Sequence, residues 1–230
     1  MFYAFDSFVF MCLITFNPEE HKYYDENGSE YISVTTLLGE MFPFDDKAIA
    51  RRISNLPNSP YYNWPVKKIL QDWEDSATLG TELHNACEQY TLNKTIPPDP
   101  ILKSCVSQYS KLKFRGKTIP EQLVYSKKYK IAGTIDLLEF CDNMIYIYDI
   151  KTYKKITRER IHKLSLQLEI YKRLAEGVYN KKCKVMGAFV FENYVKLGKN
   201  TKLKFLKPEN VRGEVDFILE ERQKQIQETE

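Results

Sequence analysis

The fold of this chain is decided by residues 131–151, which read IAGTIDLLEFCDNMIYIYDIK. Apolar, β-branched and aromatic residues dominate this stretch, and a short turn interrupts it. It therefore predicts two strands, Lys130–Phe140 and Met144–Lys151, joined as a hairpin. The two strands of an antiparallel hairpin lie side by side. We therefore expect Asp136 on the first strand and Asp149 on the second to meet at one end of the sheet.

The second strand carries a pattern suited to metal chemistry. Asp149 and Lys151 are two positions apart, so their side chains share one face, while Ile150 points into the core with its carbonyl near the same site. A lone aspartate is most often a turn residue, but burial in this apolar strand is costly without a partner or a metal. Two aspartates and a carbonyl form a hard-oxygen pocket suited to Mg²⁺ or Mn²⁺. Lys151 can then orient a water and offset charge on a phosphate.

Strand and helix patterns continue on both sides of this hairpin. Residues 21–34 predict an N-terminal hairpin around Asn27-Gly28, and Ser33 or Thr35 is expected to cap a short helix after it. Further strands are expected at Glu121–Lys128, Cys183–Phe191 and Leu203–Leu206. Further helices are expected at Asp46–Ile53, Val66–Leu92, Ile101–Phe114, Thr157–Tyr179 and from Pro208, which would occupy the N1 position.

This order of elements predicts an α/β fold, with an α+β mixed sheet flanked by helices. We expect a single domain over residues 1–230. Within it, residues 1–65 would form an N-terminal hairpin and loop region, residues 66–206 the core, and residues 207–230 a C-terminal helix. Four prolines in residues 43–66 favour loop structure there.

The composition is that of a globular protein and excludes several classes. Apolar residues make up 43% and charged residues 28% of the chain, which excludes a largely disordered, collagen-like or coiled-coil protein. The 34 basic and 31 acidic residues leave a net charge of +3, so any contact with nucleic acid would come from local patches. The five cysteines are scattered, without a Cys-x-x-Cys pair, which favours a reducing compartment over a disulfide framework or a zinc ribbon.

The first sixteen residues are strongly apolar but lack the basic segment and the cleavage site of a secretory signal. The longest uninterrupted apolar run, Phe8–Ile14, is too short to span a membrane. We interpret this segment as a buried strand or docking segment rather than a targeting segment. We therefore expect a soluble, intracellular protein without membrane contact, in a compartment that the sequence leaves open.

Two helical patterns flank the hairpin. His84 and Glu88 are four positions apart and share a helix face, and Gly80 one turn earlier permits close approach of another backbone. Gln167 and Tyr171 share a face in the same way. Taken alone, the first pattern is typical of a surface pair or a core histidine, and the second of an amphipathic helix whose tyrosine packs against the sheet.

Together these motifs form an ordered series: Gly80-x-x-x-His84, Glu121, Gly133-x-x-Asp136, Asp149-x-Lys151 and Gln167-x-x-x-Tyr171. The series resembles the RecB-like branch of the PD-(D/E)XK nuclease superfamily. It is also similar to the smaller exonucleases of that branch, the mitochondrial genome maintenance exonucleases and phage-type relatives. His21-Lys-Tyr-Tyr followed by Ser33-Val-Thr-Thr36 is similar to the start of many members. The resemblance spans residues 21–175.

The resemblance implies a restriction-endonuclease-like core and metal-dependent hydrolysis of DNA phosphodiester bonds. The ligands that it implies for Mg²⁺ or Mn²⁺ are His84, Asp136, Asp149 and the backbone carbonyl of Ile150. Lys151 would activate or position the attacking water, and Gln167 and Tyr171 would support the site and the nucleic-acid backbone. Glu121 fits an additional acidic position, although a solvated strand-end glutamate is the alternative. Members of the branch that hold an iron–sulfur cluster need four suitably placed cysteines, so we expect no cluster.

Basic side chains near these motifs favour a polyanionic substrate. Residues 151–163 hold six lysines and arginines but only one acidic residue, and residues 125–130 interleave lysines with tyrosines. A charge run is often only a solvated face, but its place beside the aspartates favours a functional role for residues 151–163. The DNA-binding candidates are Arg51, Arg52, Lys127, Lys128, Lys154, Lys155 and Arg158, together with Ser33, Thr35 and Thr36 of the opening motif.

The leading hypothesis is a metal-dependent DNA exonuclease of repair, recombination or replication that acts on single-stranded or end-containing DNA. One alternative is a structure-selective or sequence-specific endonuclease on the same fold. Another is a non-catalytic DNA-binding module of a repair assembly, which the intact series of site residues argues against. The charged tail after Glu220 could contact a replication or repair partner protein, or it could be a frayed helix end.

Overall fold

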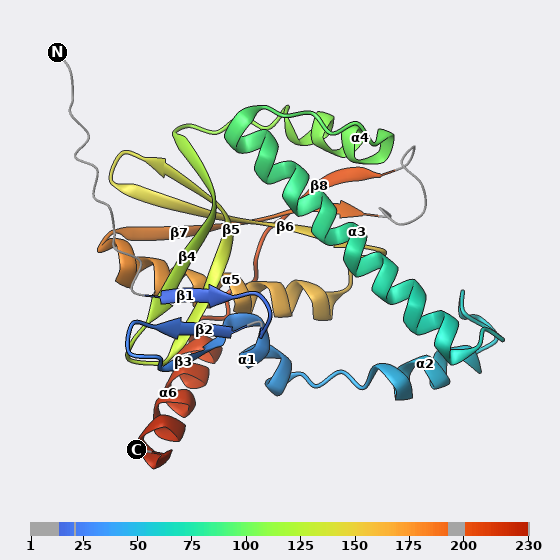
Figure 1. The fold of residues 1–230 in the computed structure, drawn as a ribbon, viewed down its shortest axis with the longest axis horizontal. Helices are drawn as coiled ribbons and strands as arrows, with labels where there is room; N and C mark the ends of the chain where they lie inside the picture. Colours follow the sequence, from blue (N-terminus) through green and yellow to red (C-terminus); the bar gives the residue numbers. More distant parts are fainter. Residues whose placement is uncertain (1–13, 21, 193–200, 230) are drawn as a thin grey trace.

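The computed structural model describes residues 14–20, 22–192 and 201–229, which form a mixed β-sheet flanked by helices (Figure 1). The predicted α/β class is therefore confirmed. The strands in this part of the chain are β1 (Ile14–Asn17), β2 (Lys22–Asp25), β3 (Glu30–Ser33), β4 (Lys117–Ser126), β5 (Ile131–Cys141), β6 (Met144–Tyr153), β7 (Lys182–Glu192) and β8 (Lys202–Leu206). The helices are α1 (Val34–Met41), α2 (Asp46–Ser54), α3 (Val66–Asn93), α4 (Pro100–Tyr109), α5 (Arg158–Tyr179) and α6 (Arg212–Thr229).

The sheet combines parallel and antiparallel pairs. Its strands lie in the order β1-β2-β3-β5-β6-β7-β8, and β4 also pairs with β5. The predicted hairpins β2–β3 and β5–β6 are antiparallel, whereas β3 with β5 and β6 with β7 are parallel. Because β3 pairs with β5, the N-terminal hairpin extends the same sheet that contains the core strands.

The sheet opens between β5 and β6, where the two predicted aspartates lie. Pairing between these strands begins beside their connecting turn and ends at Leu137 and Tyr148. Beyond this point β6 continues along β7, while β5 continues along β4 and then β3. The strands therefore diverge, and the next residues on each of them, Asp136 and Asp149, lie at a fork in the sheet.

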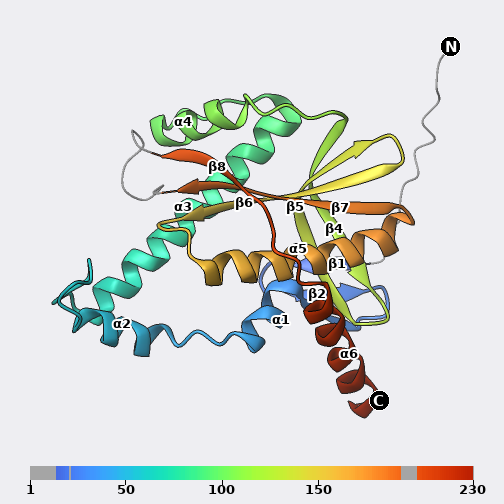
Figure 2. The same ribbon diagram turned by 180° about the vertical axis from the view of Figure 1, so that it is seen from behind.

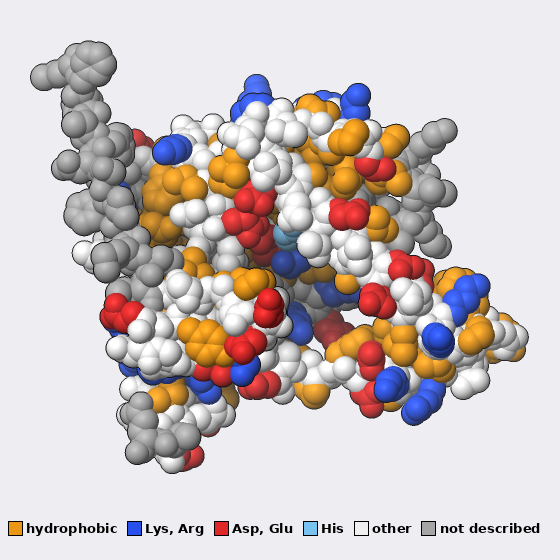
Figure 3. Space-filling view, in the orientation of Figure 1, with side chains coloured by type: hydrophobic (Ala, Val, Ile, Leu, Met, Phe, Trp, Pro, Cys, Tyr) orange, Lys and Arg blue, Asp and Glu red, His pale blue; other side chains and the backbone are white. Residues whose placement is uncertain are grey.

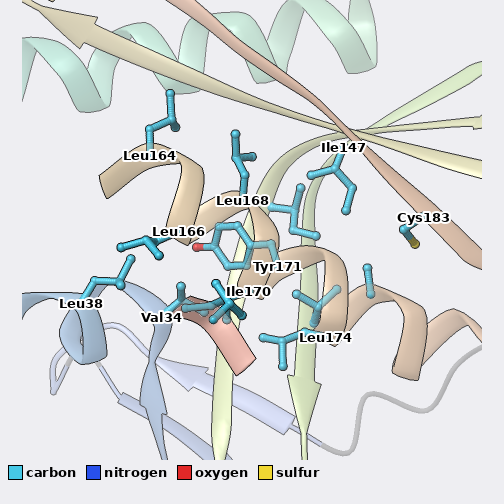
Figure 4. Packing of buried hydrophobic residues seen from close by; sticks show 14 of the residues in the cluster. Val34, Leu38, Ile147, Leu164, Leu166, Leu168, Ile170, Tyr171, Leu174 and Cys183 are labelled. Carbon is cyan, nitrogen blue, oxygen red and sulfur yellow. The ribbon is translucent and has the colours of Figure 1, made fainter. Parts of the chain in front are cut away.

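Helices cover the sheet on both faces (Figure 1 and Figure 2). On one face, Leu168 of α5 belongs to a buried cluster with Ile147 of β6 and Val34 of α1 (Figure 4). On the other face, α3 and α4 pack against the sheet through a second cluster that contains Leu83 and Phe189. The fork therefore lies between two packed layers, with α3 on one side and α5 on the other.

Side-chain caps determine where several helices begin. Ser33 caps α1, Asp99 caps α4 and Thr157 caps α5, and each side-chain oxygen accepts a hydrogen bond from a backbone N–H in the first turn. Ser33 was one of the two predicted caps for α1. The cap at Thr157 fixes the start of the helix that packs behind the fork.

The predicted end of α4 is wrong. The helix ends at Tyr109 rather than at Phe114, because the chain tightens into a turn in which Leu112 N–H donates to the Tyr109 carbonyl at 3.0 Å. Phe114 then packs edge-on against Tyr148 of β6, with ring centroids 5.5 Å apart. Packing against the sheet, which local periodicity does not report, ends this helix early.

The predicted start of α6 is also wrong. The helix begins at Arg212, so Pro208 is not its N1 residue. Glu209 N–H donates to Ser165 Oγ of α5 at 2.9 Å, and this bond holds the preceding segment against α5 in a non-helical conformation. The backbone hydrogen bond at the start of the helix, from Val215 N–H to the Val211 carbonyl, lies further along the chain than this contact.

β4 begins at Lys117, four residues before its predicted start at Glu121. Pro120 is tolerated inside this strand because β4 pairs only with β5 among the described strands, so no second ladder needs the N–H that proline lacks. The early start places Glu121 inside the β4–β5 ladder rather than at its edge.

The predicted N-terminal strand lies partly within the described residues. Ile14–Asn17 forms β1, and Ile14 is buried. The remainder of that segment, residues 1–13, and His21 lie outside the described residues. Among the helices that the structure describes, none combines the length and the apolar character that a membrane span requires.

Gly80 lets α3 lie against β6. A Cβ at this position would be 2.9 Å from Thr152 Oγ1, so the close neighbour is a side chain and not the backbone that the sequence predicted.

Alanine normally stabilises a helix interior by about 1 kcal/mol over glycine, but we expect Gly80→Ala to lower the free energy of unfolding here. In a Thr152→Ala background the same change should raise it by about 0.5–1 kcal/mol. Urea denaturation of the four proteins measures this, and an equal effect in both backgrounds would contradict it.

Candidate metal centre

Three carboxylates lie side by side on three adjacent strands. The β4–β5 ladder pairs both neighbours of Glu121 with both neighbours of Asp136, so these two residues lie opposite each other. Across the fork, Asp136 Oδ2 accepts a hydrogen bond from Ile150 N–H at 2.7 Å, so Asp136 lies beside the end of β6 that carries Asp149. The fork thus gathers acidic side chains from three separate stretches of the sequence.

His84 of α3 joins this group. Its Nδ1 lies 3.5 Å from Asp136 Oδ2, and ligand atoms of His84, Glu121 and Asp136 all lie within 4.8 Å of one another. Glu121 has a backbone φ of 49°, a region that costs an L-residue about 1–2 kcal/mol. Strain of this kind is concentrated at functional sites. Glu121 therefore belongs to the cluster rather than to a strand end, while its side chain remains exposed to solvent.

The imidazole of His84 is held in its neutral form. Burial, followed by the positive charge of Lys151, lowers the pKa of His84 to about 4. A hydrogen bond to the backbone of Ile150 opposes this shift and brings that peptide to the same cluster. At neutral pH the ring can therefore offer a lone pair to a metal ion.

Asp149 and Lys151 form a buried ion pair at the fork. Lys151 Nζ donates to Asp149 Oδ1 at 2.9 Å and lies 2.8 Å from Oδ2. The Asp149 side chain is only 2% exposed, yet its Oδ2 accepts no hydrogen bond from the described residues. Burial alone would lower the pKa of Lys151, but Asp149 and Asp136 hold it above its ordinary value, so the lysine is charged.

The carboxylates are poorly compensated. Burial, followed by the charge of Asp136, raises the pKa of Asp149 to about 7. Burial also raises the pKa of Asp136, even though Ile150 N–H donates a hydrogen bond to its Oδ2 at 2.7 Å. Desolvation and then Asp136 raise the pKa of Glu121 to about 8, even though much of its side chain is exposed. A cation bound among these groups would relieve this repulsion.

These residues fit a hard divalent cation. Carboxylate oxygens are the preferred ligands of Mg²⁺, and Mn²⁺ accepts them together with an imidazole nitrogen. The buried Asp149 Oδ2, which lies 2.8 Å from Lys151 Nζ without forming a hydrogen bond, is an oxygen that such an ion could also bind. Ligand atoms of His84, Glu121 and Asp136 form the cluster that could hold the ion. Asp149 and the backbone of Ile150, which the resemblance also implied as ligands, lie beside His84.

Gln167 and Tyr171 lie behind the fork. Both are buried in α5, and they are hydrogen-bonded to each other. Tyr171 belongs to the buried cluster around α5 (Figure 4). Its ring rests on Gly133 of β5, where a Cβ would lie 2.7 Å from Tyr171 Cε1. They can therefore hold the backbone that leads to Asp136, as the resemblance implied. The resemblance also implied support of the nucleic-acid backbone, but both side chains are buried and offer it no exposed contact.

Charged side chains gather in a hollow beside α3, where acidic, basic and histidine atoms meet at the surface (Figure 3). The DNA-binding candidates are distributed unevenly around it. Ser33 is buried as the cap of α1 and hydrogen-bonds to Thr35 and Thr36, so it is not a surface contact. The exposed candidates are Thr35, Thr36, Arg51, Arg52, Lys127, Lys128, Lys155 and Arg158.

Three of the predicted DNA-binding lysines have surroundings that the sequence did not indicate. Lys127 and Lys128 lie on the β4–β5 turn beside α6, whose Arg222 donates to the Tyr129 carbonyl at 3.3 Å. Lys154 is bound to Asp72 at 2.6 Å and to the Tyr61 hydroxyl at 2.8 Å, so it is an ion-pair partner within the protein. Sequence reasoning missed these two partners, because no local pattern links residues 82 and 93 positions apart.

Comparison with known proteins adds little to this geometry. No protein-family model matches the sequence, and no curated protein matches it. Among solved structures, the crystal structure of SSO0001 aligns with 83% of this chain and 74% of that chain, at 15% sequence identity and a TM-score of 0.36. A likeness at this level identifies neither the family nor the activity of the chain.

Proposed function

We propose that the protein is a metal-dependent DNA exonuclease of the PD-(D/E)XK type, with a restriction-endonuclease-like core, that serves DNA repair, recombination or replication. One observation carries the proposal: Glu121, Asp136, Asp149, His84 and Lys151 converge at a single fork in the sheet. The resemblance of the ordered sequence motifs to RecB-like nucleases supports it independently of this geometry.

The chain supplies several functions that phosphodiester hydrolysis needs. When bound, Mg²⁺ or Mn²⁺ would polarise a phosphoryl oxygen and make an attacking water more acidic. Lys151, held by Asp149, presents a fixed positive charge where negative charge develops on the phosphate. The neutral His84 and the carboxylates would hold the ion, while Gln167 and Tyr171 keep the backbone of β5 in place. No iron–sulfur cluster enters the proposal.

A digestion time course in Mg²⁺ or Mn²⁺ tests the proposal. We expect linear DNA labelled at the 5′ or the 3′ end to be degraded from an end, no reaction in EDTA, and covalently closed circles to remain intact. The labels report polarity, and single-stranded and duplex forms report strand preference. Nicking of closed circles would favour the endonuclease alternative. Binding of DNA without cleavage under any of these conditions would favour the non-catalytic module.

A further inference from the structure

Four aromatic side chains form a continuous row where α2 meets the first half of α3. Phe44 lies 5.7 Å from Trp73, Trp73 lies 6.4 Å from Tyr61, and Tyr61 lies 5.5 Å from Trp64, measured between ring centroids. Phe44 is 64% exposed, and the other three are half-buried. This aromatic row (Phe44, Tyr61, Trp64 and Trp73) is therefore partly exposed to solvent rather than enclosed in a core.

Cations lie over the rings of this row. Lys68 Nζ is 4.1 Å from the centroid of the Trp64 ring, and Lys154 Nζ is 5.4 Å from that of Tyr61. Arg51 and Arg52 are exposed in the last turn of α2. Surfaces that bind single strands combine rings on which bases stack with positive charges that follow the phosphates. The row supplies the rings, and Lys68, Arg51 and Arg52 supply the charges, because Lys154 is already paired with Asp72.

The row is fixed relative to the metal centre. Lys154 lies three residues after Lys151 of β6 and bonds to both Asp72 of α3 and Tyr61. It therefore connects the aromatic row to the β-strand that carries Asp149 and Lys151. Trp73 and His84 are eleven residues apart on α3, which is about three turns, so they lie on the same side of the helix about 16 Å apart along its axis. A single strand of DNA lying along this side of α3 would reach both the aromatic row and the metal centre.

We propose that the aromatic row binds unpaired bases of a DNA single strand whose phosphate lies at the metal centre, an inference that rests on the proposed nuclease function for the identity of the polymer. The aromatic faces would stack on bases and Lys68 would face the backbone. Duplex DNA does not fit this role, because its bases are already paired and stacked. The row therefore selects for strands with exposed bases several nucleotides from the bond that is cleaved.

The chain contains a built-in probe for this contact. Its two tryptophans are Trp64 and Trp73, and both belong to the row. We expect a 20-nucleotide oligothymidylate to quench the tryptophan fluorescence of the full chain in EDTA, where no cleavage occurs. An abasic oligomer of the same length, which has the same phosphates, and a blunt duplex should quench weakly. Equal quenching by the abasic oligomer would overturn the proposal, because charge alone would then explain binding.

A matched pair of variants separates stacking from general effects. Phe44→Ala should weaken binding of the oligothymidylate about tenfold, the effect of losing one base–aromatic stack. Phe217→Ala on α6, where the phenylalanine is 60% exposed, should leave the affinity unchanged. Equal affinities for Phe44→Ala and the unaltered chain would also overturn the proposal. If the protein cleaves DNA but shows no base-dependent quenching, the aromatic row is not a binding surface and the nuclease function still stands. If it shows base-dependent quenching but no cleavage, the binding surface stands and the nuclease function does not.

Discussion

A Lys151→Met variant is expected to lose metal-dependent DNA cleavage by about a hundred- to a thousandfold, the effect of removing one positioned charge that stabilises a transition state. The reason lies in the pair at the fork, where Lys151 Nζ is 2.9 Å from Asp149 Oδ1. Asp149→Asn should lose cleavage as well, because it removes a candidate metal ligand and the group that orients the lysine. Initial rates on a labelled single strand in Mg²⁺ measure both effects.

Stability separates the chemical role of this pair from its structural role. Either single substitution leaves a buried charge without its partner, which lowers the free energy of unfolding by up to about 3–5 kcal/mol. The double variant Asp149→Asn/Lys151→Met removes both charges, so we expect it to regain much of that stability and none of the activity. Lys184→Met, at an exposed lysine of β7, is the control and should change neither quantity. Full cleavage by either single variant would exclude the assignment of the site.

The hairpin that forms the fork was predictable because its signals are local. Residues 131–141 and 144–153 carry strand-like apolar patterns, and Asp142, with a φ of 53°, occupies a turn position that aspartate tolerates. The ends of α4 and α6 were not predictable in the same way. Phe114 packs on Tyr148 and Glu209 N–H bonds to Ser165, and both contacts join positions far apart in the sequence.

The candidate site also contains residues whose positions local spacing predicts and residues whose positions depend on long-range contacts. Strand alternation predicted that Asp149 and Lys151 share one face, because they are two positions apart. The ion pair that they form there was not predicted. The place of Glu121 depends on the register of β4 against β5, which the sequence does not state. Lys154 belongs to a run of basic residues that reads as a phosphate-binding surface. Its ion pair with Asp72 arises only when α3 folds against the end of β6.

Mn²⁺ is expected to stabilise the protein against unfolding, and Asp136→Asn is expected to abolish this stabilisation together with cleavage. Asp136 lies opposite Glu121, beside the end of β6 that carries Asp149 and within reach of His84, so it is the carboxylate that every other ligand surrounds. An ion at a hundred times its dissociation constant contributes about 2.7 kcal/mol. For a domain of this size, that free energy raises the unfolding temperature by about 5–10 °C.

The substitution is chosen so that a loss of metal binding is not confused with a loss of folding. Asparagine keeps an oxygen that can accept from Ile150 N–H, as Asp136 Oδ2 does at 2.7 Å, and it removes a buried charge whose pKa burial has raised. We therefore expect metal-free Asp136→Asn to be at least as stable as the unaltered chain. Asp142→Asn makes the same chemical change in the exposed turn of the same hairpin and should keep the full response to Mn²⁺. If Asp136→Asn responds to Mn²⁺ as Asp142→Asn does, the ion binds elsewhere and the fork is not a metal centre.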